Sequence, residues 1–216
     1  MELIGITLAR VVAFLEVQIL DPFGKTSTPV ALANLASRFS FTKVPQKLEE
    51  MDFQKGIELG IGKFDNINID RFSIFTNAVL IDTRSTTEDS ERVLMEFLNF
   101  TKAAFGATVV PSRKNFVNQI VFRSNLRLAL LNPVLEPIAA RLSAFVSGEL
   151  KQPVAYEPTE VIIGADVSLL NLKPVHFTLA RRAESPFFEN TYFSSAPLRT
   201  AEHLELVVEL EKALQS

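Results

Sequence analysis

The start of the chain alternates polar and apolar positions with the period of two that a β-strand requires. Within residues 3–20, Glu16 and Gln18 fall on one face of such a strand. Five apolar side chains share the opposite face: Val11, Ala13, Leu15, Val17 and Ile19. Because successive side chains of a strand point to opposite sides of the sheet, the pattern predicts one or two sheet strands over residues 3–20.

Helix and strand signals then alternate through the first half. Thr28 followed by Pro29 is typical of a helix start, and the Ala- and Leu-rich stretch that follows predicts a short helix as far as Phe39. A second short helix is predicted from Pro45 to Phe53. Residues 56–64 and 67–82 have the alternation of two strands.

The clearest helix of the chain comes next. Ser85 and Glu88 have the spacing of a capping box, in which two side chains satisfy the free N–H groups of the first turn. Apolar residues then recur at helical intervals until Gly106, a residue type that commonly ends helices. These signals predict a helix between Ser85 and Gly106.

The second half repeats this order. A strand is predicted at 116–124, and Asn132 with Pro133 starts a helix that Gly148 and Pro153 end. The apolar positions of this helix include Leu135, Ile138, Leu142 and Phe145. Strands at about 159–168 and 174–182, an extended stretch at 187–198 and a last helix from Thr200 to Leu214 complete the chain.

Both halves therefore read strand, helix, strand, strand, helix. This order predicts an α+β fold with a mostly antiparallel sheet and four or five helices. The closest parallel between the halves sets the segment 83–100 beside the segment 198–214, although few residues coincide. Two interpretations stay open: a tandem duplication, or two unrelated halves. We expect a single domain, 1–216, with a subdivision into 1–108 and 109–216 at the polar stretch 106–115.

Composition narrows the class of protein. The chain has 216 residues, a formal net charge of −3 and 47% apolar residues, values typical of a folded globular domain. The absence of a basic excess disfavours nucleic acid as a partner. The chain has no cysteine, which excludes disulfides, thiolate metal sites and cysteine nucleophiles. It has 18 Phe residues, which indicate either a Phe-packed core or a buried partner surface.

The apolar N-terminal stretch raises the question of a signal peptide or membrane span. Glu2 lies where a secretory signal would be basic, and Arg10 and Glu16 would lie inside any span. A central Arg costs about 2.5–3.5 kcal/mol on insertion. We therefore expect a cytoplasmic or intravirion protein without a membrane segment.

One motif points to phosphate chemistry. Gly24, Lys25 and Thr26 look like the end of a Walker A motif, in which backbone N–H groups and a Lys bind phosphates and a hydroxyl holds magnesium. Asp82, at the end of an apolar strand, is the candidate magnesium ligand. The first glycine of the motif is missing, because Ile19 stands at its position. A surface turn before a helix is the simpler interpretation.

The two histidines give no catalytic site. His176 falls on a predicted strand, where a core or edge position is the common role, and His203 falls on the last helix, where capping or surface polarity accounts for it. The two histidines cannot form a paired metal-binding face, and the chain has no thiolate. We predict no catalytic residue, no metal and no cofactor, and the sequence leans away from an enzyme.

The segment 181–193 has the most unusual composition. Two arginines, Arg181 and Arg182, precede four aromatic rings, and this combination favours a protein-binding patch or a buried strand pair over a platform for bases. The rings are those of Phe187, Phe188, Tyr192 and Phe193. From these features we expect a non-enzymatic interaction or assembly module that forms homo-oligomers, or binds a protein partner, through a Phe-rich surface. The alternative is a nucleotide or phosphate-ester enzyme that uses the Gly24-Lys25-Thr26 turn.

Overall fold

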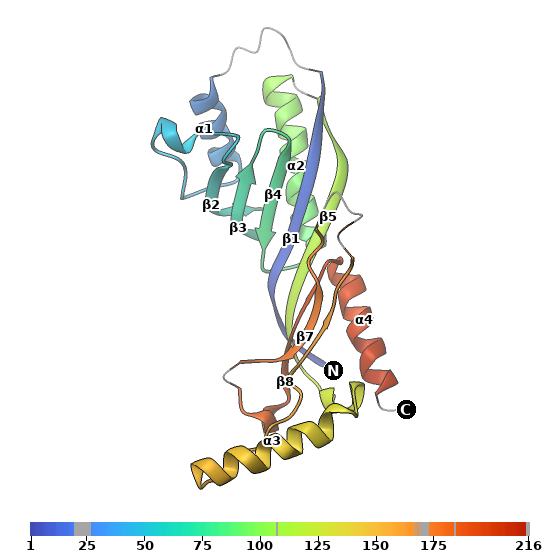
Figure 1. Ribbon diagram of the computed structural model, residues 1–216. Helices are drawn as coiled ribbons and strands as arrows, with labels where there is room; N and C mark the ends of the chain where they lie inside the picture. The colour runs from blue at the N-terminus through green and yellow to red at the C-terminus, as the bar shows by residue number, and fades with distance from the viewer. Residues whose placement is uncertain (20–26, 107, 167, 169–172, 184, 215–216) are drawn as a thin grey trace. The chain divides into compact units, whose positions relative to one another are not determined.

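The computed structural model describes residues 1–19, 27–106, 108–166, 168, 173–183 and 185–214. In these residues the chain forms an eight-stranded antiparallel sheet and four α-helices, which confirms the predicted α+β class (Figure 1). The strands of the first half are β1 (Glu2–Ile19), β2 (Ile57–Phe64), β3 (Ile67–Ile74) and β4 (Ala78–Thr83). Its helices are α1 (Thr28–Arg38) and α2 (Thr87–Phe105).

The second half repeats the same element order. Its strands are β5 (Thr108–Arg123), β6 (Glu160–Ile163), β7 (Phe177–Arg181) and β8 (Thr191–Ala196), and its helices are α3 (Leu135–Leu150) and α4 (Thr200–Ala213). The strand order in the sheet is β2-β3-β4-β1-β5-β8-β7-β6. If β5, β6, β7 and β8 are taken as the counterparts of β1, β2, β3 and β4, the order is symmetric about its centre, where β1 and β5 are neighbours. Each half is therefore β-α-β-β-β-α, one strand more than the sequence predicts.

The additional strand of the first half comes from a turn that the sequence pattern does not reveal. Residues 67–82 were expected to form one strand, but the chain turns after Ile74 and resumes as β4 at Ala78. The N–H of Phe75 donates to the Ala78 carbonyl at 2.8 Å and closes the turn. The prediction of a single strand was wrong because β-forming residues fill both sides of this short turn.

Other boundaries also differ from the predictions. The helix expected from Pro45 to Phe53 is only a short 3-10 turn, Leu48–Glu50. The cap of α2 is Thr86 rather than Ser85, since its hydroxyl accepts the N–H of Asp89 at 3.1 Å. Gly106 ends α2 in the left-handed conformation, as predicted. Residues 108–115 of the polar stretch 106–115 form the first part of β5, and the subdivision into 1–108 and 109–216 stays a prediction.

The chain divides into two compact units that do not follow the order of the sequence. The Phe-cluster unit comprises residues 6–119 and 197–201. The α3 unit comprises residues 1–5, 120–196 and 202–216. Each unit is described by itself below. None of the helices in the described residues has the length and apolar character to span a membrane.

A cluster of phenylalanine rings forms the core of the Phe-cluster unit. Phe72 on β3 contacts Phe39, Phe41 and Phe97, with ring centroids 5.8, 5.6 and 5.2 Å apart. All four rings are buried, together with apolar residues of β1, β4, α1 and α2. Aromatic pairs at these distances contribute about 0.5–1.5 kcal/mol each beyond the burial of their area. Part of the Phe surplus therefore lies in this core.

The core of the α3 unit is smaller and contains polar groups. Phe122 stacks on Tyr192 with ring centroids 5.7 Å apart, and both side chains are buried. The Tyr192 hydroxyl donates a hydrogen bond to the Leu126 carbonyl, which satisfies its buried polar end. Leu179 of β7 and Val207 of α4 are also fully buried.

Candidate functional site

The predicted phosphate site has one described member. Gly24, Lys25 and Thr26 lie outside the described residues. Asp82 lies on β4, directly opposite Arg10 of β1 in the strand pairing. The Arg10 guanidinium donates to both carboxylate oxygens of Asp82, at 2.6 and 2.8 Å. This bidentate pair occupies the oxygens that a magnesium ion would need, so the geometry does not favour Asp82 as a metal ligand.

The first arginine of the predicted interaction segment makes its contacts within the same unit. Arg181 on β7 pairs with Glu157 at 2.5 Å and donates to the Phe187 carbonyl at 3.0 Å. Its guanidinium lies over the Phe187 ring at 4.7 Å and over the Tyr192 ring at 5.3 Å. These contacts are intramolecular, so Arg181 fixes the local structure instead of offering a free cation.

The aromatic residues of this segment do not form one continuous platform. Tyr192 is fully buried, and Phe193 is half-buried. Arg182 and Phe187 are exposed, and Phe188 is the most exposed large apolar side chain of the segment at 83%. The prediction of a surface that includes Tyr192 was wrong, because alternate residues of β8 point into the core.

The two histidines lie in opposite environments. His176 is exposed and precedes β7, with its ring beside Gly164. His203 on α4 is fully buried, which contradicts the surface role expected from the sequence. Its Nε2 lies 2.8 Å from Ser194 Oγ, and burial lowers the pKa of the imidazole to about 4. The signal for burial is the spacing of His203 and Val207, one turn apart on the same inner face of α4.

The Ser194–His203 pair has the residue types of a nucleophile and its base, but not the geometry. The Ser194 hydroxyl donates to the Thr178 carbonyl at 2.8 Å, so Nε2 of His203 is the donor to Ser194 Oγ. A general base would instead accept the serine proton. Both side chains are fully buried. The pair therefore acts as a structural hydrogen bond between β8 and α4.

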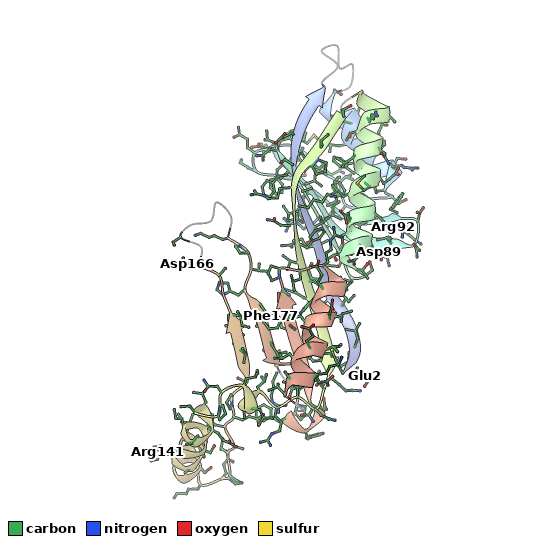
Figure 2. All side chains as sticks on the ribbon, turned by 90° about the vertical axis from the view of Figure 1, so that its right-hand side faces the viewer. Glu2, Asp89, Arg92, Arg141, Asp166 and Phe177 are labelled. Carbon is green, nitrogen blue, oxygen red and sulfur yellow. The ribbon has the colours of Figure 1, made fainter. Side chains whose placement is uncertain are left out.

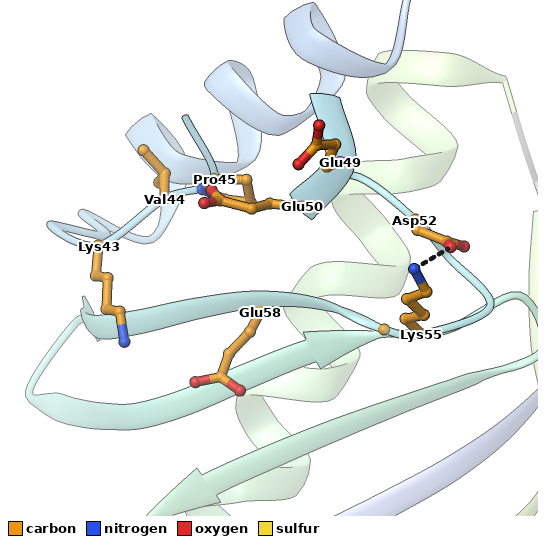
Figure 3. Close-up of a pocket in the computed structure, with 9 residues that line it drawn as sticks. Lys43, Val44, Pro45, Glu49, Glu50, Asp52, Lys55 and Glu58 are labelled. Atoms are coloured by element: carbon orange, nitrogen blue, oxygen red, sulfur yellow. Dashed lines mark ion pairs between the residues drawn. The ribbon is translucent and has the colours of Figure 1, made fainter. Parts of the chain in front are cut away.

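The Phe-cluster unit has a surface pocket of about 390 Å³ beside β2 (Figure 3). Asp52 pairs with Lys55 at 3.8 Å, and Glu58 pairs with Arg71 at 2.9 Å. Glu50 accepts the N–H groups of residues 46 and 47, and these hydrogen bonds lower its pKa. Most acids of the pocket are thus engaged within the chain. Among the described residues, no group of three or more acidic or histidine side chains could hold a metal ion.

The most unusual surface belongs to α3, the yellow helix in Figure 1. None of the residues of α3 is buried. Four large apolar side chains, spaced three, four and three residues apart, form an exposed stripe that we call the α3 seam. They are Leu135 (39% exposed), Ile138 (60%), Leu142 (42%) and Phe145 (60%). Val134, just before the helix, is 73% exposed. A surface helix of a globular protein normally turns such a stripe towards its own core.

A small and polar side of α3, distinct from the seam, is hydrogen-bonded to the chain segment that follows the helix. Ser143 Oγ accepts the N–H of Tyr156 at 2.8 Å, and Ser147 Oγ accepts the N–H of Val154 at 2.9 Å. The Ser147 hydroxyl also donates to the Val154 carbonyl at 3.2 Å. These three hydrogen bonds join α3 to the segment 154–156, and none of them involves a seam residue. Arg141, labelled in Figure 2, lies over the Phe145 ring at 5.3 Å.

The sequence located the seam residues as the apolar positions of a helix but did not predict their exposure. It assigned the interaction surface to 181–193 instead. Comparison with known proteins adds no further assignment, since no known protein family and no curated protein matches the chain.

Proposed function

We propose that the protein is a non-enzymatic assembly module that self-associates through the α3 seam. The observation that carries the proposal is the orientation of α3, which exposes its large apolar residues and anchors itself through Ser143 and Ser147. Burial of one such apolar side chain contributes about 1.5–3 kcal/mol. The four seam side chains are 39–60% exposed, so each would contribute about half of this value, which favours weak, reversible association.

The charges of α3 support a protein partner over a membrane or a nucleic acid. Helices that lie on membranes carry many Lys and Arg on their polar face. Within its bounds α3 has one basic residue, Arg141, against the two acids Glu136 and Glu149. This balance gives no attraction to anionic lipid or to phosphates. An apolar protein surface of complementary shape can bury the seam, and this contact needs no basic residues on the polar face of α3.

The proposal replaces the interaction site expected from the sequence with a different one in the same unit. The rings of the segment 181–193 are partly buried, and Arg181 is engaged within the chain. Phe187 and Phe188 remain exposed, and we treat them as a separate surface. The decisive comparison is therefore between variants of the α3 seam and variants of this surface.

The test uses sedimentation velocity at several protein concentrations. Ile138→Glu places a charge in the seam and is expected to reduce the associated fraction strongly. Ala140→Glu is the matched control, because Ala140 is exposed on the side of α3 opposite the seam. Phe188→Glu tests the other exposed surface. Equal effects of Ile138→Glu and Ala140→Glu, or an effect of Phe188→Glu alone, would contradict the proposal.

A further inference from the structure

We propose that the α3 seam of one copy packs against the α3 seam of a second copy, with the two helices antiparallel. In this arrangement Leu135 lies against Phe145 of the second copy, and Ile138 lies against its Leu142. The inference rests on the proposed function and specifies which surface of the second copy occupies the seam. It predicts an interface with two-fold symmetry, in which the same patch serves both partners.

The spacing of the seam has the pattern of a helix–helix interface. Intervals of three, four and three residues are those of alternating a and d positions in a heptad, which bring apolar side chains onto one line of contact. In an antiparallel pair the a positions of one helix meet the d positions of the other. Leu135 and Leu142 take the a positions, and Ile138 and Phe145 take the d positions. Each seam residue therefore meets an apolar partner when the two seams are centred on each other.

Glu149 restricts the register of this pair. It occupies the next a position, one turn beyond Phe145. A shift of the partner by one heptad in one direction would set Glu149 against Ile138, and burial of a carboxylate against an apolar side chain is costly. In the centred register Glu149 lies beyond the first turn of the opposite helix, where it stays in water. A shift in the other direction leaves Phe145 without an apolar partner.

Charge also selects the antiparallel direction. A parallel pair in the same register would place Glu149 beside Glu149 of the second copy and align the two helix dipoles. Like charges at equivalent positions are destabilising. An antiparallel pair separates the two Glu149 carboxylates to opposite ends and sets each helix N-terminus near the C-terminus of the other, which is the favourable dipole arrangement.

The exposed area sets the expected strength of the pair. The four seam side chains and Val134 together expose roughly 500 Å² per copy, so their complete burial in both copies would cover at most about 1,000 Å², the lower limit for a specific interface. Interfaces of this size between two single helices are reversible. We therefore expect association that depends on concentration.

The absence of cysteine from the chain allows a direct test of direction and register. Leu135→Cys and Phe145→Cys are prepared separately, one of them with ¹⁵N, mixed in equal amounts and oxidised mildly. The masses of the disulfide-linked dimers then distinguish mixed pairs from identical pairs. The proposal predicts mixed pairs in large excess over the statistical fraction, because in this register each Leu135 lies opposite Phe145 of the second copy. Ala140→Cys mixed with Ala144→Cys is the control and should show no such preference.

The outcomes separate this inference from the proposed function. Identical pairs of Leu135→Cys in excess would show a parallel arrangement and overturn the antiparallel one. A wild-type dimer that is lost in Ile138→Glu, without preferential cross-linking of mixed pairs, would place the seam against another surface of the second copy and also overturn the inference. In both cases the proposed function would stand. A monomer at every concentration would overturn both.

Discussion

Thr87 and Thr200 cap each other's helices. The N–H of Thr87 donates to Oγ1 of Thr200 at 2.9 Å, and the N–H of Thr200 donates to Oγ1 of Thr87 at 2.8 Å. The two residues are the first residues of α2 and α4, the last elements of the two halves. They stand at equivalent places in the repeated element order and make the same contact in both directions. This reciprocity supports the interpretation of the chain as a duplication.

The reciprocal caps predict a large loss of stability when either hydroxyl is removed. Both threonines are buried, so Thr200→Val would leave the buried N–H of Thr87 without its acceptor. An unsatisfied buried donor costs about 1–3 kcal/mol. Urea unfolding should show a decrease of this size for Thr87→Val and for Thr200→Val.

A control variant and a double variant distinguish the stability lost with the caps from the general effect of a Thr→Val substitution. Thr101→Val removes a hydroxyl that donates to the Leu98 carbonyl of its own helix at 2.8 Å, and this substitution should cost less stability. Because Thr87 and Thr200 share their bonds, the double variant should lose less stability than the sum of the single variants. Additive losses would show that the two caps act independently.

His203 predicts a dependence of stability on pH. Its pKa is lowered from 6.5 to about 4 by burial, so between these values the unfolded chain binds a proton that the folded chain does not. The free energy of unfolding should therefore fall as the pH falls from 6.5 towards 4. The full loss amounts to about 3 kcal/mol for a shift of this size.

The measurement is urea unfolding at several pH values between 7 and 4.5, for the wild type and for His203→Gln. The Gln side chain retains a donor for Ser194 Oγ but does not titrate, so its stability should depend less on pH than that of the wild type. Carboxylates contribute equally to both proteins and cancel in the difference. Parallel curves for the two proteins would show that His203 is not the source.

Two glycines predict opposite effects of the same substitution. A Cβ at Gly62 would lie 2.3 Å from the Phe41 ring and 2.9 Å from the Phe39 carbonyl, so Gly62→Ala should destabilise the protein by about 1–3 kcal/mol. Gly148 lies in α3 with no atom within 4 Å of the added Cβ. Gly148→Ala should stabilise by about 0.5–1 kcal/mol, the helix-propensity difference. Thermal unfolding of the two variants checks both signs.

The local signals in the sequence were sufficient for much of the secondary structure. Gly106 ends α2 and Thr200 begins α4 as expected, because capping is encoded in a few adjacent residues. The turn at residues 75–77 was missed, because propensity alone does not show where a run of β-forming residues folds back. The contact between Thr87 and Thr200 joins residues 113 positions apart, and no local pattern reports it.

The sequence did not predict which apolar residues of the candidate site are exposed. The stripe of Leu135, Ile138, Leu142 and Phe145 is visible in the sequence, but the same spacing occurs in helices that pack on their own core. In the folded chain the stripe is exposed, while Ser143 and Ser147 make the hydrogen bonds between α3 and the segment 154–156. The Phe content was equally ambiguous, because the rings of Phe39, Phe72 and Phe97 meet only in the folded chain.

The solution mass of the wild-type protein tests the central claim most directly. Light scattering over a range of concentrations should give a mass that rises from the 24.0 kDa of one chain towards twice that value. The rise should be reversible on dilution, as the small area of the seam implies. A mass that stays at one chain over the whole range would contradict self-association through α3.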